Sequence, residues 1–447
     1  MFDYQSYFRG KKITVMGLGR LGRGVGDAAF LAECGAELIV TDIKSEAELT
    51  DSVAELKDFS NIEFVLGEHR EQDFINRDFI LVGAGVPLDS PYVAAARAAG
   101  VPLKQSAAWF AELSGVPIIG VTGTRGKSTV TQMIHHTLRL ATGETILLGG
   151  NVRGVSNLQL FKVASDDSLC VMELDSWQLQ GFGWNEISPQ IAVFTNFMED
   201  HQNYYHSMDA YFADKTNIFK YQEGTGVLVT TPEVFALAGE KGLTLKQEVV
   251  LADASALPED CLLAMPGEHN RLNAALAYEA LKATSLSEEL IFEGLATFSG
   301  VEGRLQYLGE VNGAKIYNDN NATTPQATAV GIKAVADGQN VVLIAGGADK
   351  EIALTDLLAA IETYTKQVIL IPGNGTDRLI EELNNANMTV NSHILVEDLP
   401  AAFEEARLAA EPQDAILFSP AFASFSQYQN EYERNDQFLS LVREAMD

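Results

Sequence analysis

Residues 120 to 130 have the sequence Gly120-Val121-Thr122-Gly123-Thr124-Arg125-Gly126-Lys127-Ser128-Thr129-Val130. The apolar run 116–121, which precedes the glycine loop, predicts a buried strand. The stretch 128–140 predicts the helix that follows. A strand, a glycine loop and a helix in this order are typical of a phosphate-binding P-loop. The loop is a shorter variant, because Val121 stands where the common G-x-x-x-x-G-K-[ST] pattern has glycine.

The residue types in this loop suit Mg-ATP. Gly123 and Gly126 let the backbone turn its N–H groups toward an anion, and the helix start adds partial positive charge. Lys127 supplies a full charge, and the Ser128 hydroxyl can ligate Mg2+. The predicted ATP-binding residues of the loop are Gly123, Thr124, Gly126, Lys127, Ser128 and Thr129. A surface glycine turn with a solvated lysine is the alternative.

Composition limits the class of protein. The chain has 447 residues, of which 47% are hydrophobic and 21% charged, which is enough for about two to four domains, and we expect three. Lys plus Arg number 31 against 61 Asp plus Glu, so the net charge is −30. This charge argues against nucleic acid or an anionic membrane as a partner. An anionic ligand must therefore meet local basic groups.

Cysteine usage and the first residues suggest a compartment. Cys34, Cys170 and Cys261 lie far apart and include no C-x-x-C pair, so neither a disulfide framework nor a zinc site is indicated. The chain begins Met-Phe-Asp-Tyr-Gln, which is not a signal peptide, and no apolar run approaches the roughly 18 residues of a membrane span. We expect a cytoplasmic protein without membrane insertion.

The first segment carries a second glycine pattern. A strand over 13–16 is followed by a G-x-G-x-x-G made by Gly17, Gly19 and Gly22, and then by a helical stretch. The next strand, 37–41, ends at Asp42, about 20 residues after the last glycine, where a ribose-binding carboxylate is expected. The pattern predicts a Rossmann-type half. From these residues alone, NAD, another nucleotide diphosphate, or merely a tight strand-to-helix turn remain open.

The same alternation of strands and helices continues to the end of the chain. Strands are predicted at 79–82, 169–172, 190–195, 315–318, 340–345, 367–371, 393–396 and 415–419. The expected fold is α/β with three domains: a Rossmann-like N-terminal domain over 1–104, a central P-loop ATPase domain with a mostly parallel sheet over 105–300, and a Rossmann-like C-terminal domain over 301–447. Ligands of such sheets bind at the carboxyl ends of the strands.

Several side chains at those strand ends are candidates for chemistry. Glu173 follows the strand 169–172, and His201 follows the strand 190–195, so with Ser128 they could hold one or two Mg2+ ions. A solvated loop acid is the alternative for each carboxylate. Lys215, taken alone, is an ordinary surface lysine in a predicted helix.

Four further polar residues could contact the nucleotide. Asn270 and Asn273 share one helix face and could bind an adenine edge, with helix capping as the alternative. Arg304 and Asp319 follow a glycine loop and a predicted strand, where phosphate and ribose contacts are natural roles.

Together these motifs resemble the Mur ligase family of ATP-dependent amino-acid ligases over essentially the whole chain. The motifs are Gly123-Thr124-Arg125-Gly126-Lys127-Ser128-Thr129, Glu173-Leu174-Asp175-Ser176-Trp177-Gln178, Glu199-Asp200-His201, Gly267-Glu268-His269-Asn270, Tyr317-Asn318-Asp319 with Ala322-Thr323, and Ser419-Pro420-Ala421-Phe422-Ala423-Ser424. The last of these is similar to the members that add glutamate.

The resemblance implies a reaction and its substrates. ATP would phosphorylate the carboxylate of UDP-N-acetylmuramoyl-L-alanine, and the amine of D-glutamate would attack the acyl phosphate, in the synthesis of the peptidoglycan precursor. Both partners are small molecules, and we expect a monomer. The implied catalytic residues are Lys127, Glu173, His201 and Lys215, and the implied Mg2+ ligands are Ser128, Glu173, His201 and Lys215, the last as a carbamylated lysine.

The resemblance also implies the remaining binding residues. The UDP-precursor residues would be Gly17, Gly19, Arg20, Leu21, Gly22, Asp42, Ile43 and Asn151. Those for the acceptor amino acid would be Thr323, Lys350 and Ser424, and those for ATP beyond the loop would be Asn270, Asn273, Arg304 and Asp319.

Four positions depart from the family pattern near the expected substrates. Asp175 replaces a serine, Asn321 replaces a lysine, Arg153 lies in an altered G-N-x-G motif, and Glu431 replaces an aromatic residue. A Mur-type ligase with another acceptor or precursor is therefore an alternative. An NAD-dependent oxidoreductase, based on the first glycine pattern, and a catalytically silent nucleotide-binding regulator are alternatives from other classes.

Overall fold

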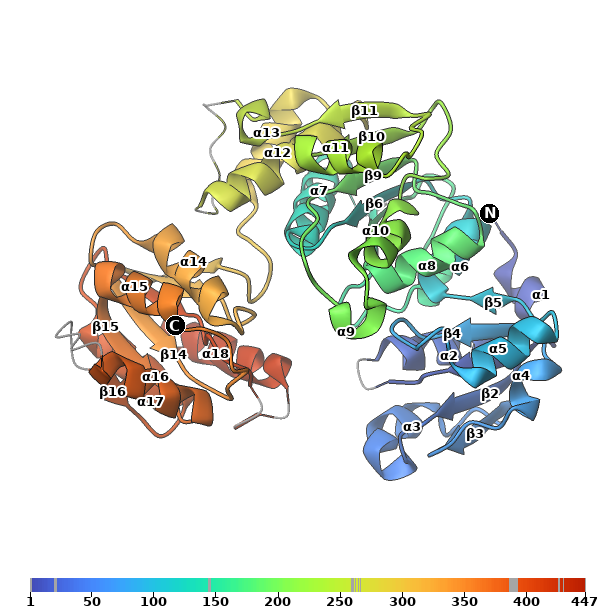
Figure 1. The fold of residues 1–447 in the computed structure, drawn as a ribbon, viewed down its shortest axis with the longest axis horizontal. Helices are drawn as coiled ribbons and strands as arrows, with labels where there is room; N and C mark the ends of the chain where they lie inside the picture. The colour runs from blue at the N-terminus through green and yellow to red at the C-terminus, as the bar shows by residue number, and fades with distance from the viewer. Residues whose placement is uncertain are drawn as a thin grey trace. The chain divides into compact units, whose positions relative to one another are not determined.

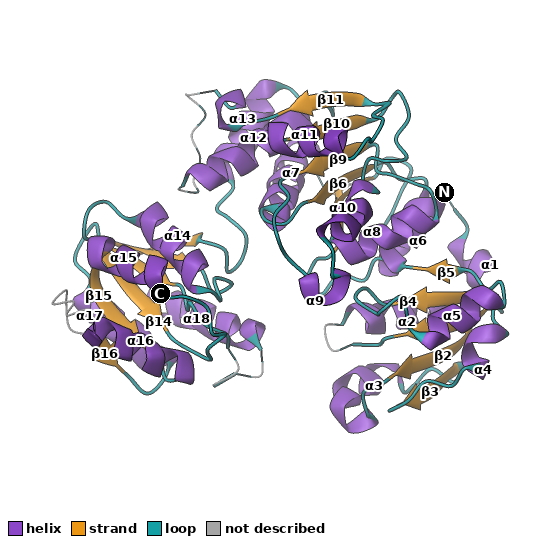
Figure 2. Cartoon of the chain, in the orientation of Figure 1, coloured by secondary structure: helices purple, strands orange, loops and turns teal. Residues whose placement is uncertain are grey.

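The chain forms three β-sheets that follow one another in sequence (Figure 1). The computed structural model describes residues 2–19, 22–143, 146–258, 261, 263, 265, 267–385, 393–424, 427–428 and 430–446, with backbone only at 202 and 203. In each sheet the strands, orange in Figure 2, are flanked by helices. The α/β fold with three domains and mostly parallel sheets is thus confirmed.

The first sheet has the strand order β3-β2-β1-β4-β5, and all its pairs are parallel. Its strands are β1 (Lys12–Met16), β2 (Glu37–Asp42), β3 (Ile62–Leu66), β4 (Phe79–Val82) and β5 (Leu103–Lys104). The chain leaves β1 toward one edge and returns to β4 on the other side, so a topological switch point lies between these two strands. Ligands of open α/β sheets bind in the crevice at such a point.

Short helices connect these strands. They are α1 (Tyr4–Phe8), α2 (Arg23–Glu33), η1 (Glu46–Leu49), α3 (Thr50–Leu56), α4 (Gln72–Ile75) and α5 (Pro91–Ala98). Gly22 is the N-cap of α2 and has a φ of 78°, a left-handed conformation that glycine adopts without strain. The predicted G-x-G-x-x-G loop therefore does lead from a strand into a helix.

The second sheet is also wholly parallel and has the order β11-β10-β9-β6-β8-β7. Its strands are β6 (Ile118–Thr122), β7 (Ile146–Gly150), β8 (Leu169–Glu173), β9 (Ile191–Phe194), β10 (Val227–Thr230) and β11 (Glu248–Leu251). The central strand β6 is buried along its whole length, as its apolar sequence predicts. Because β6 lies between β8 and β9, the P-loop after β6 is flanked by the ends of both neighbours.

The helices of this part begin with α6 and end with α13. They are α6 (Ser106–Ser114), α7 (Lys127–Thr142), η2 (Leu158–Lys162), α8 (Ser176–Trp184), α9 (Gln202–Tyr205), α10 (Met208–Thr216), α11 (Pro232–Glu240), η3 (Ala254–Ala256), α12 (Glu268–Lys282) and α13 (Glu288–Thr297). The first two sheets share a hydrophobic core that includes the fully buried Phe8, Trp109 and Phe182.

The third sheet has the order β12-β13-β17-β14-β15-β16. Its strands are β12 (Gln306–Val311), β13 (Ala314–Asn318), β14 (Val341–Ala345), β15 (Thr365–Leu370), β16 (His393–Leu395) and β17 (Ala415–Phe418). Only the β12–β13 pair is antiparallel among the described pairs. Strand β17 returns between β13 and β14, so the ends of these three strands meet at one edge.

Two apolar clusters cover the faces of this third sheet. The helices are α14 (Pro325–Val335), α15 (Thr355–Tyr364), α16 (Asn374–Asn385), α17 (Leu399–Ala409) and α18 (Glu431–Met446). Phe403 and Phe438, from α17 and α18, pack edge-to-face with ring centroids 5.6 Å apart.

The chain divides into two compact units. One contains Met1–Glu259 and Leu272–Gly294 and holds the first two sheets, and the other contains Asp260–Arg271 and Leu295–Asp447 and holds the third. The expected boundaries at 105 and 301 stay predictions. Within the part of the chain described, no helix is long and apolar enough to cross a membrane.

Candidate active site

Two glycines determine the conformation of the P-loop. Gly123 has a φ of 144°, and a Cβ added to it would lie 1.9 Å from the Thr195 hydroxyl oxygen. Gly126 has a φ of 82°, and an added Cβ would lie 2.4 Å from the side-chain oxygen of Asn273. Neither position has room for a side chain, and both have backbone angles that favour glycine.

The loop is attached to the segment that follows β9. Thr124 N–H donates to the Asn196 carbonyl at 3.0 Å, and Met198 N–H donates to the Thr124 hydroxyl at 2.9 Å. Arg125 N–H donates to the Asn196 side-chain oxygen at 2.9 Å. These bonds hold the loop in one conformation, and they give the Thr124 side chain a structural role beside its predicted contact with ATP.

Lys127 begins helix α7 and turns back over the loop. Its Nζ donates to the carbonyls of Gly123 and Thr124, each at 3.1 Å. Ser128 and the buried Thr129 follow in the first turn of the helix. A helix start with a lysine at this position attracts anions, because the N–H groups and the ammonium both carry positive charge.

Lys215 belongs to α10 and is buried next to the same loop. Its side chain is only 1% exposed, and Nζ donates to the Gly123 carbonyl at 2.8 Å. Burial, and next the positive charge of Lys127, lower the pKa of Lys215 well below its usual value. The alternative of an ordinary surface lysine is therefore wrong, and the buried amine beside the P-loop loses its proton more readily than a solvated lysine does.

Glu173 ends strand β8 on one side of the P-loop. The residue is 6% exposed, and its carboxylate accepts a hydrogen bond from the Asn151 amide at 3.3 Å. Asn151 N–H also donates to the Glu173 carbonyl at 2.7 Å. The Asn151 side-chain oxygen in turn accepts from the Arg23 guanidinium. A connected series of side chains thus joins the start of α2 to this buried carboxylate.

His201 lies after β9 on the other side. It has a φ of 53°, and its N–H donates to the Asp200 carboxylate at 2.9 Å. Its ring lies beside Trp177, with centroids 4.5 Å apart. Burial lowers the pKa of His201, while the charge of Asp200 opposes this effect. A neutral imidazole, the form that can accept a hydrogen bond or bind a metal, is therefore favoured.

The donors around the P-loop fit Mg2+ better than zinc. No group of three or more His, Cys, Asp or Glu side chains that could hold a metal ion occurs among the residues described. Ser128 and Glu173 offer hard oxygen ligands instead. Mg2+ commonly takes one or two protein oxygens and completes its shell with phosphate and water, so a sparse oxygen set of this kind suits it.

Helix α12 contributes two buried asparagines. Asn273 is 8% exposed, and its side-chain oxygen faces the position where Gly126 lacks a Cβ. Asn270 is 2% exposed. Asn273 therefore lies against the P-loop itself. Contact of either amide with an adenine edge stays a prediction.

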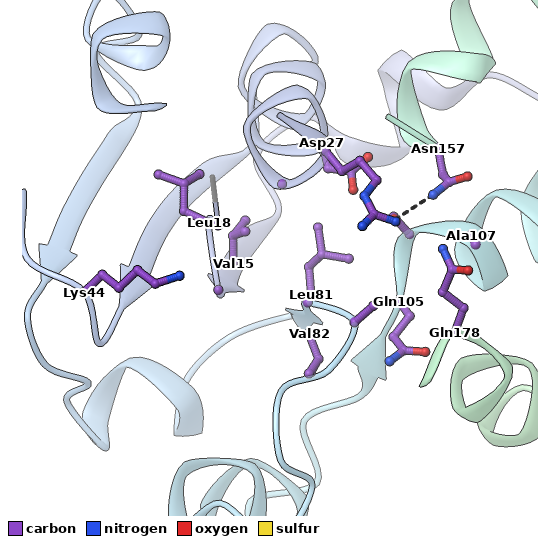
Figure 3. A pocket seen from close by; sticks show the side chains of 17 residues that line it. Val15, Leu18, Asp27, Lys44, Leu81, Val82, Gln105, Ala107, Asn157 and Gln178 are labelled. Carbon is purple, nitrogen blue, oxygen red and sulfur yellow. Dashed lines mark hydrogen bonds between the residues drawn. The ribbon is translucent and has the colours of Figure 1, made fainter. Parts of the chain in front are cut away.

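A cavity of about 310 Å3, the N-terminal pocket, opens at the switch point of the first sheet (Figure 3). Gly17, Gly19 and Gly83 belong to its lining. Lys44 lies at one side in Figure 3, and Gln105, Asn157 and Gln178 lie at the other, with Asn157 donating to Ser106 at 3.3 Å. The pocket thus combines backbone groups of the first sheet with the polar side chains of Gln105, Asn157 and Gln178, which come later in the chain.

Asp42 supports this pocket rather than lining it. Its carboxylate accepts from the N–H groups of Leu18 at 3.0 Å, Gly19 at 3.2 Å and Lys44 at 3.0 Å. These bonds fix the glycine loop, so any contact with a ribose stays a prediction. Ile43 is 72% exposed.

Some residues predicted to contact the precursor are not among those that line this pocket. Two cationic side chains that do line it were not predicted. Arg20 and Leu21 lie outside the described residues, and Gly22 caps α2. Arg23 and Lys44 line the N-terminal pocket, although the sequence analysis did not single them out. Their positions directly after the glycine pattern and after Asp42 were the available signal.

A cavity of about 280 Å3, the C-terminal pocket, lies at the strand ends of the third sheet. The three predicted acceptor residues, Thr323, Lys350 and Ser424, all line it, together with Arg304, Asn321, Ala423, Glu431 and Tyr432. Lys350 Nζ donates to the Thr323 hydroxyl at 2.8 Å. The structure thus brings together residues that were predicted separately, and it adds Arg304, which was predicted to contact ATP.

Asp319 follows β13, is buried, and is not among the residues that line the C-terminal pocket. Its carboxylate accepts from Ser419 Oγ at 2.8 Å and from Leu305 N–H at 3.0 Å. Burial raises the pKa of Asp319 to about 7, although both hydrogen bonds act in the opposite direction. A ribose contact for this carboxylate stays a prediction.

The departures from the family pattern have identifiable environments. Asp175 is the N-cap of α8, where it accepts from Gln178 N–H at 2.7 Å while the Gln178 side chain bonds back to Asp175 N–H. This capping box explains a carboxylate there. Asn321 donates to the Gly303 carbonyl through its backbone at 2.8 Å, and Arg153 is exposed.

Comparison with protein families identifies the class. The N-terminal domain of MurD-like Mur ligases matches residues 11–104, the Mur ligase middle domain matches 121–241, and the Mur ligase glutamate ligase domain matches 303–422. The chain belongs to the Mur ligase family, as the motifs indicated.

Among curated proteins, similar relatives carry one name. The UDP-N-acetylmuramoylalanine–D-glutamate ligase of Roseiflexus sp. (strain RS-1) is 33% identical over 465 residues, covering 97% of this chain and 98% of that protein. The ligase of the same name from Geobacillus kaustophilus (strain HTA426) is 32% identical over 458 residues, covering 98% of each.

Solved structures of more distant proteins share the fold. MurC from Thermotoga maritima has a TM-score of 0.61 at 19% identity, covering 97% of this chain and 100% of that one. MurF from Acinetobacter baumannii has a TM-score of 0.56 at 18% identity, covering 85% of this chain and 93% of that one.

Proposed function

We propose that this chain is an ATP- and Mg2+-dependent ligase that joins D-glutamate to UDP-N-acetylmuramoyl-L-alanine. The observation that carries the proposal is the convergence of Lys127, Glu173 and Lys215 on one P-loop. The substrates are inferred from the name shared by the relatives that match nearly the full chain.

The P-loop would bind the ATP phosphates. Its glycines leave the backbone open to an anion, and Lys127 would exchange its bonds with loop carbonyls for bonds with phosphate oxygens. Ser128 and Thr129 would complete this site, with Asn270, Asn273, Arg304 and Asp319 as the remaining nucleotide contacts. Lys127 would neutralise negative charge as the phosphoryl group transfers.

One or two Mg2+ ions would be held by Glu173, Ser128, His201 and Lys215. The ions would screen the charge of the phosphates. A carbamate on Lys215 would supply an oxygen ligand in place of a cation. The lowered pKa of Lys215 supports this, because a neutral amine, and not an ammonium, adds CO2. The amine nitrogen bonds to the carbon of CO2 and loses a proton.

The reaction would proceed in two steps. A carboxylate oxygen of the precursor attacks the γ-phosphorus of ATP, the bond to the bridging oxygen breaks, and ADP leaves. The neutral amine of glutamate then attacks the acyl carbonyl, the carbon–oxygen bond to phosphate breaks, and the nitrogen loses a proton to give the amide. Inorganic phosphate is the second product.

The three domains would divide the work. Residues 1–104 would bind the UDP precursor at the N-terminal pocket, with Gly17, Gly19, Arg20, Leu21, Gly22, Asp42, Ile43 and Asn151 as the predicted contacts. Residues 105–300 would form the ATPase domain. Residues 301–447 would bind glutamate at the C-terminal pocket through Thr323, Lys350 and Ser424, which lie in a cavity with cationic lining.

We also propose a monomeric cytoplasmic enzyme whose partners are small molecules. The net charge of −30 disfavours nucleic acid as a partner. Size-exclusion chromatography with light scattering tests the monomer.

The function is tested with purified protein, ATP, Mg2+, the precursor and D-glutamate. Phosphate should be released only when all four are present, and mass spectrometry should find the precursor with one glutamate added. Turnover independent of glutamate would contradict the proposal. ATP binding without phosphate release would favour a silent regulator.

A Mur-type ligase with a different acceptor is the second candidate, and Glu431 favours it, because this acidic side chain lines the C-terminal pocket. A mixed pool of D- and L-amino acids, with mass spectrometry of the product, separates the two candidates. Selective incorporation of a neutral or basic amino acid would establish the second.

A further inference from the structure

Glu431 is an acidic side chain in a pocket that is otherwise suited to anions. Arg304 and Lys350 line the C-terminal pocket with positive charge, and Thr323 and Ser424 offer hydroxyl groups. Among the described lining residues, Glu431 is the one carboxylate. An amino acid with two carboxylates must therefore enter a site that already contains a third.

The protein fixes Glu431 at this place. It is the first residue of α18, and its carbonyl accepts from the Asn320 side chain at 2.9 Å. Asn430 caps the helix by accepting from the N–H groups of Tyr432 and Glu433, each at 3.0 Å. The helix start is thus held to the loop after β13, and these bonds fix the backbone from which the Glu431 side chain enters the pocket.

A buried arginine strengthens this attachment. Arg434 is fully buried, and it donates to the side-chain oxygen of Asn320 at 2.8 Å and to the Asn320 carbonyl at 3.0 Å. Because a charged donor to two buried acceptors is costly to unpair, the first turn of α18 is a rigid part of the site.

Lys350 is close enough to Glu431 to interact with it electrostatically. Burial lowers the pKa of Lys350, the negative charge of Glu431 raises it, and the positive charge of Arg434 lowers it. Lys350 also donates to Thr323. Lys350 and Glu431 both line the C-terminal pocket, so the predicted acceptor lysine lies in the field of a carboxylate of the protein.

We propose that Glu431 sets the selectivity of the C-terminal pocket by competing with the acceptor's carboxylate for Lys350. This inference rests on the proposed function. Glu431 weakens the binding of a dicarboxylic amino acid, while an acceptor with an uncharged side chain is affected less. An aromatic residue, which the family pattern has at this position, would impose no such repulsion.

The test is the substitution Glu431→Gln, which removes the charge and keeps the shape. The KM for D-glutamate, measured at saturating ATP and precursor, should fall roughly five- to tenfold, the size of a close charge pair in a partly solvated site. The substitution should alter KM and leave kcat unchanged. Glu433→Gln is the matched control, because Glu433 is exposed, lies two residues further along the same helix, and does not line the pocket.

Glu431→Asp separates charge from shape, since it keeps the carboxylate on a shorter side chain, and its KM should stay within about twofold of the unmodified protein. An unchanged or higher KM in Glu431→Gln would overturn the proposal, and a higher one would assign Glu431 to the acceptor's ammonium group. If the unmodified protein does not use D-glutamate at all, the proposed function fails instead. Equal melting temperatures of the variants exclude a folding effect.

Discussion

The P-loop and the C-terminal pocket both contain cationic side chains, but the two sites are formed by different means. At the P-loop, the backbone determines the site: Gly123 and Gly126 have no room for a Cβ, and Lys127 and Lys215 both donate to the Gly123 carbonyl. At the C-terminal pocket, side chains determine it, and a carboxylate stands among the cations.

Because of this difference, the two sites differ in how far their residues can change without loss of the site. A backbone site tolerates few residue types, so its chemistry follows from a short motif. A side-chain site can change its net charge by one substitution while the fold stays the same. The binding of ATP should therefore be a fixed property of this chain, whereas the choice of acceptor depends on single residues such as Glu431.

The largest expected effect is at Lys127. Lys127→Ala should reduce phosphate release roughly a thousandfold, because a positioned charge on the transferring phosphoryl group is lost. Phosphate release and circular dichroism together check this, since the fold should remain. Arg139→Ala, at an exposed position near the end of the same helix, is the control and should keep full activity. A half-active Lys127→Ala protein would mean that the loop backbone alone suffices.

The second effect is at Lys215. Lys215→Ala should lower the turnover about a hundredfold, because metal-centred charge stabilisation is worth several kcal/mol. Short carboxylic acids such as acetate should restore part of it if a carbamate is the active form. Exposed Lys220, just beyond α10, supplies the control Lys220→Ala. Full activity of Lys215→Ala would remove the residue from the mechanism.

The third effect tests how the N-terminal pocket binds its ligand. Backbone groups would do so as at the P-loop, or side chains as at the C-terminal pocket. Arg23 lines this pocket and bonds to Asn151. Arg23→Leu should raise the KM for the precursor about tenfold, because hydrogen bonds from a charged donor contribute about 1.5–3 kcal/mol. The KM for glutamate should not change. Arg97→Leu, on the exposed surface of α5, is the control, and an unaltered precursor KM in Arg23→Leu would mean that the Arg23 side chain does not bind the precursor.

The smallest expected effect is a change in stability with pH, and it concerns Asp319. Its pKa is about 7 in the folded protein against a usual 3.8, so the folded state binds more protons between these values. The free energy of unfolding should therefore fall as the pH rises from about 4 to about 7, by at most about 1.4 kcal/mol per pH unit.

Asp319→Asn removes this titration. Its melting temperature, relative to the unmodified protein, should rise as the pH increases from 5 to 8, whereas Asp337→Asn, at an exposed site, should show no such trend. A constant difference across this range would mean that Asp319 is ionised throughout.

Much of the fold could be predicted from hydrophobic runs. Buried parallel strands such as β1, β6 and β14 are continuous apolar segments, and their predicted positions agree with the structure to within a few residues. Strands β3, β5, β7, β10, β11 and β12 were missed, and all of them except β10 lie at sheet edges. In β3 and β11 most residues are only partly buried, and polar residues interrupt the apolar pattern.

The candidate site was predictable where chemistry needs a particular backbone. Gly123, Gly126 and Lys127 form a motif, whereas Arg23 and Lys44 enter the N-terminal pocket only through the way the chain folds. The burial of Lys215 could not be predicted from its neighbours, because taken alone it is an ordinary lysine in a predicted helix. For Arg23 and Lys44 the sequence offered only their positions next to the glycine pattern and Asp42, and for the burial of Lys215 the residues around it offered no signal.

The contact between Trp177 and His201 offers an optical signal. Their rings are 4.5 Å apart, and the other two tryptophans of the chain, Trp109 and Trp184, are not part of this contact. A protonated imidazole quenches the fluorescence of a neighbouring indole, and a change in the distance between the rings alters its emission. The protein therefore carries its own fluorophore beside His201, and we expect any change in this contact to be detectable by fluorescence without a label.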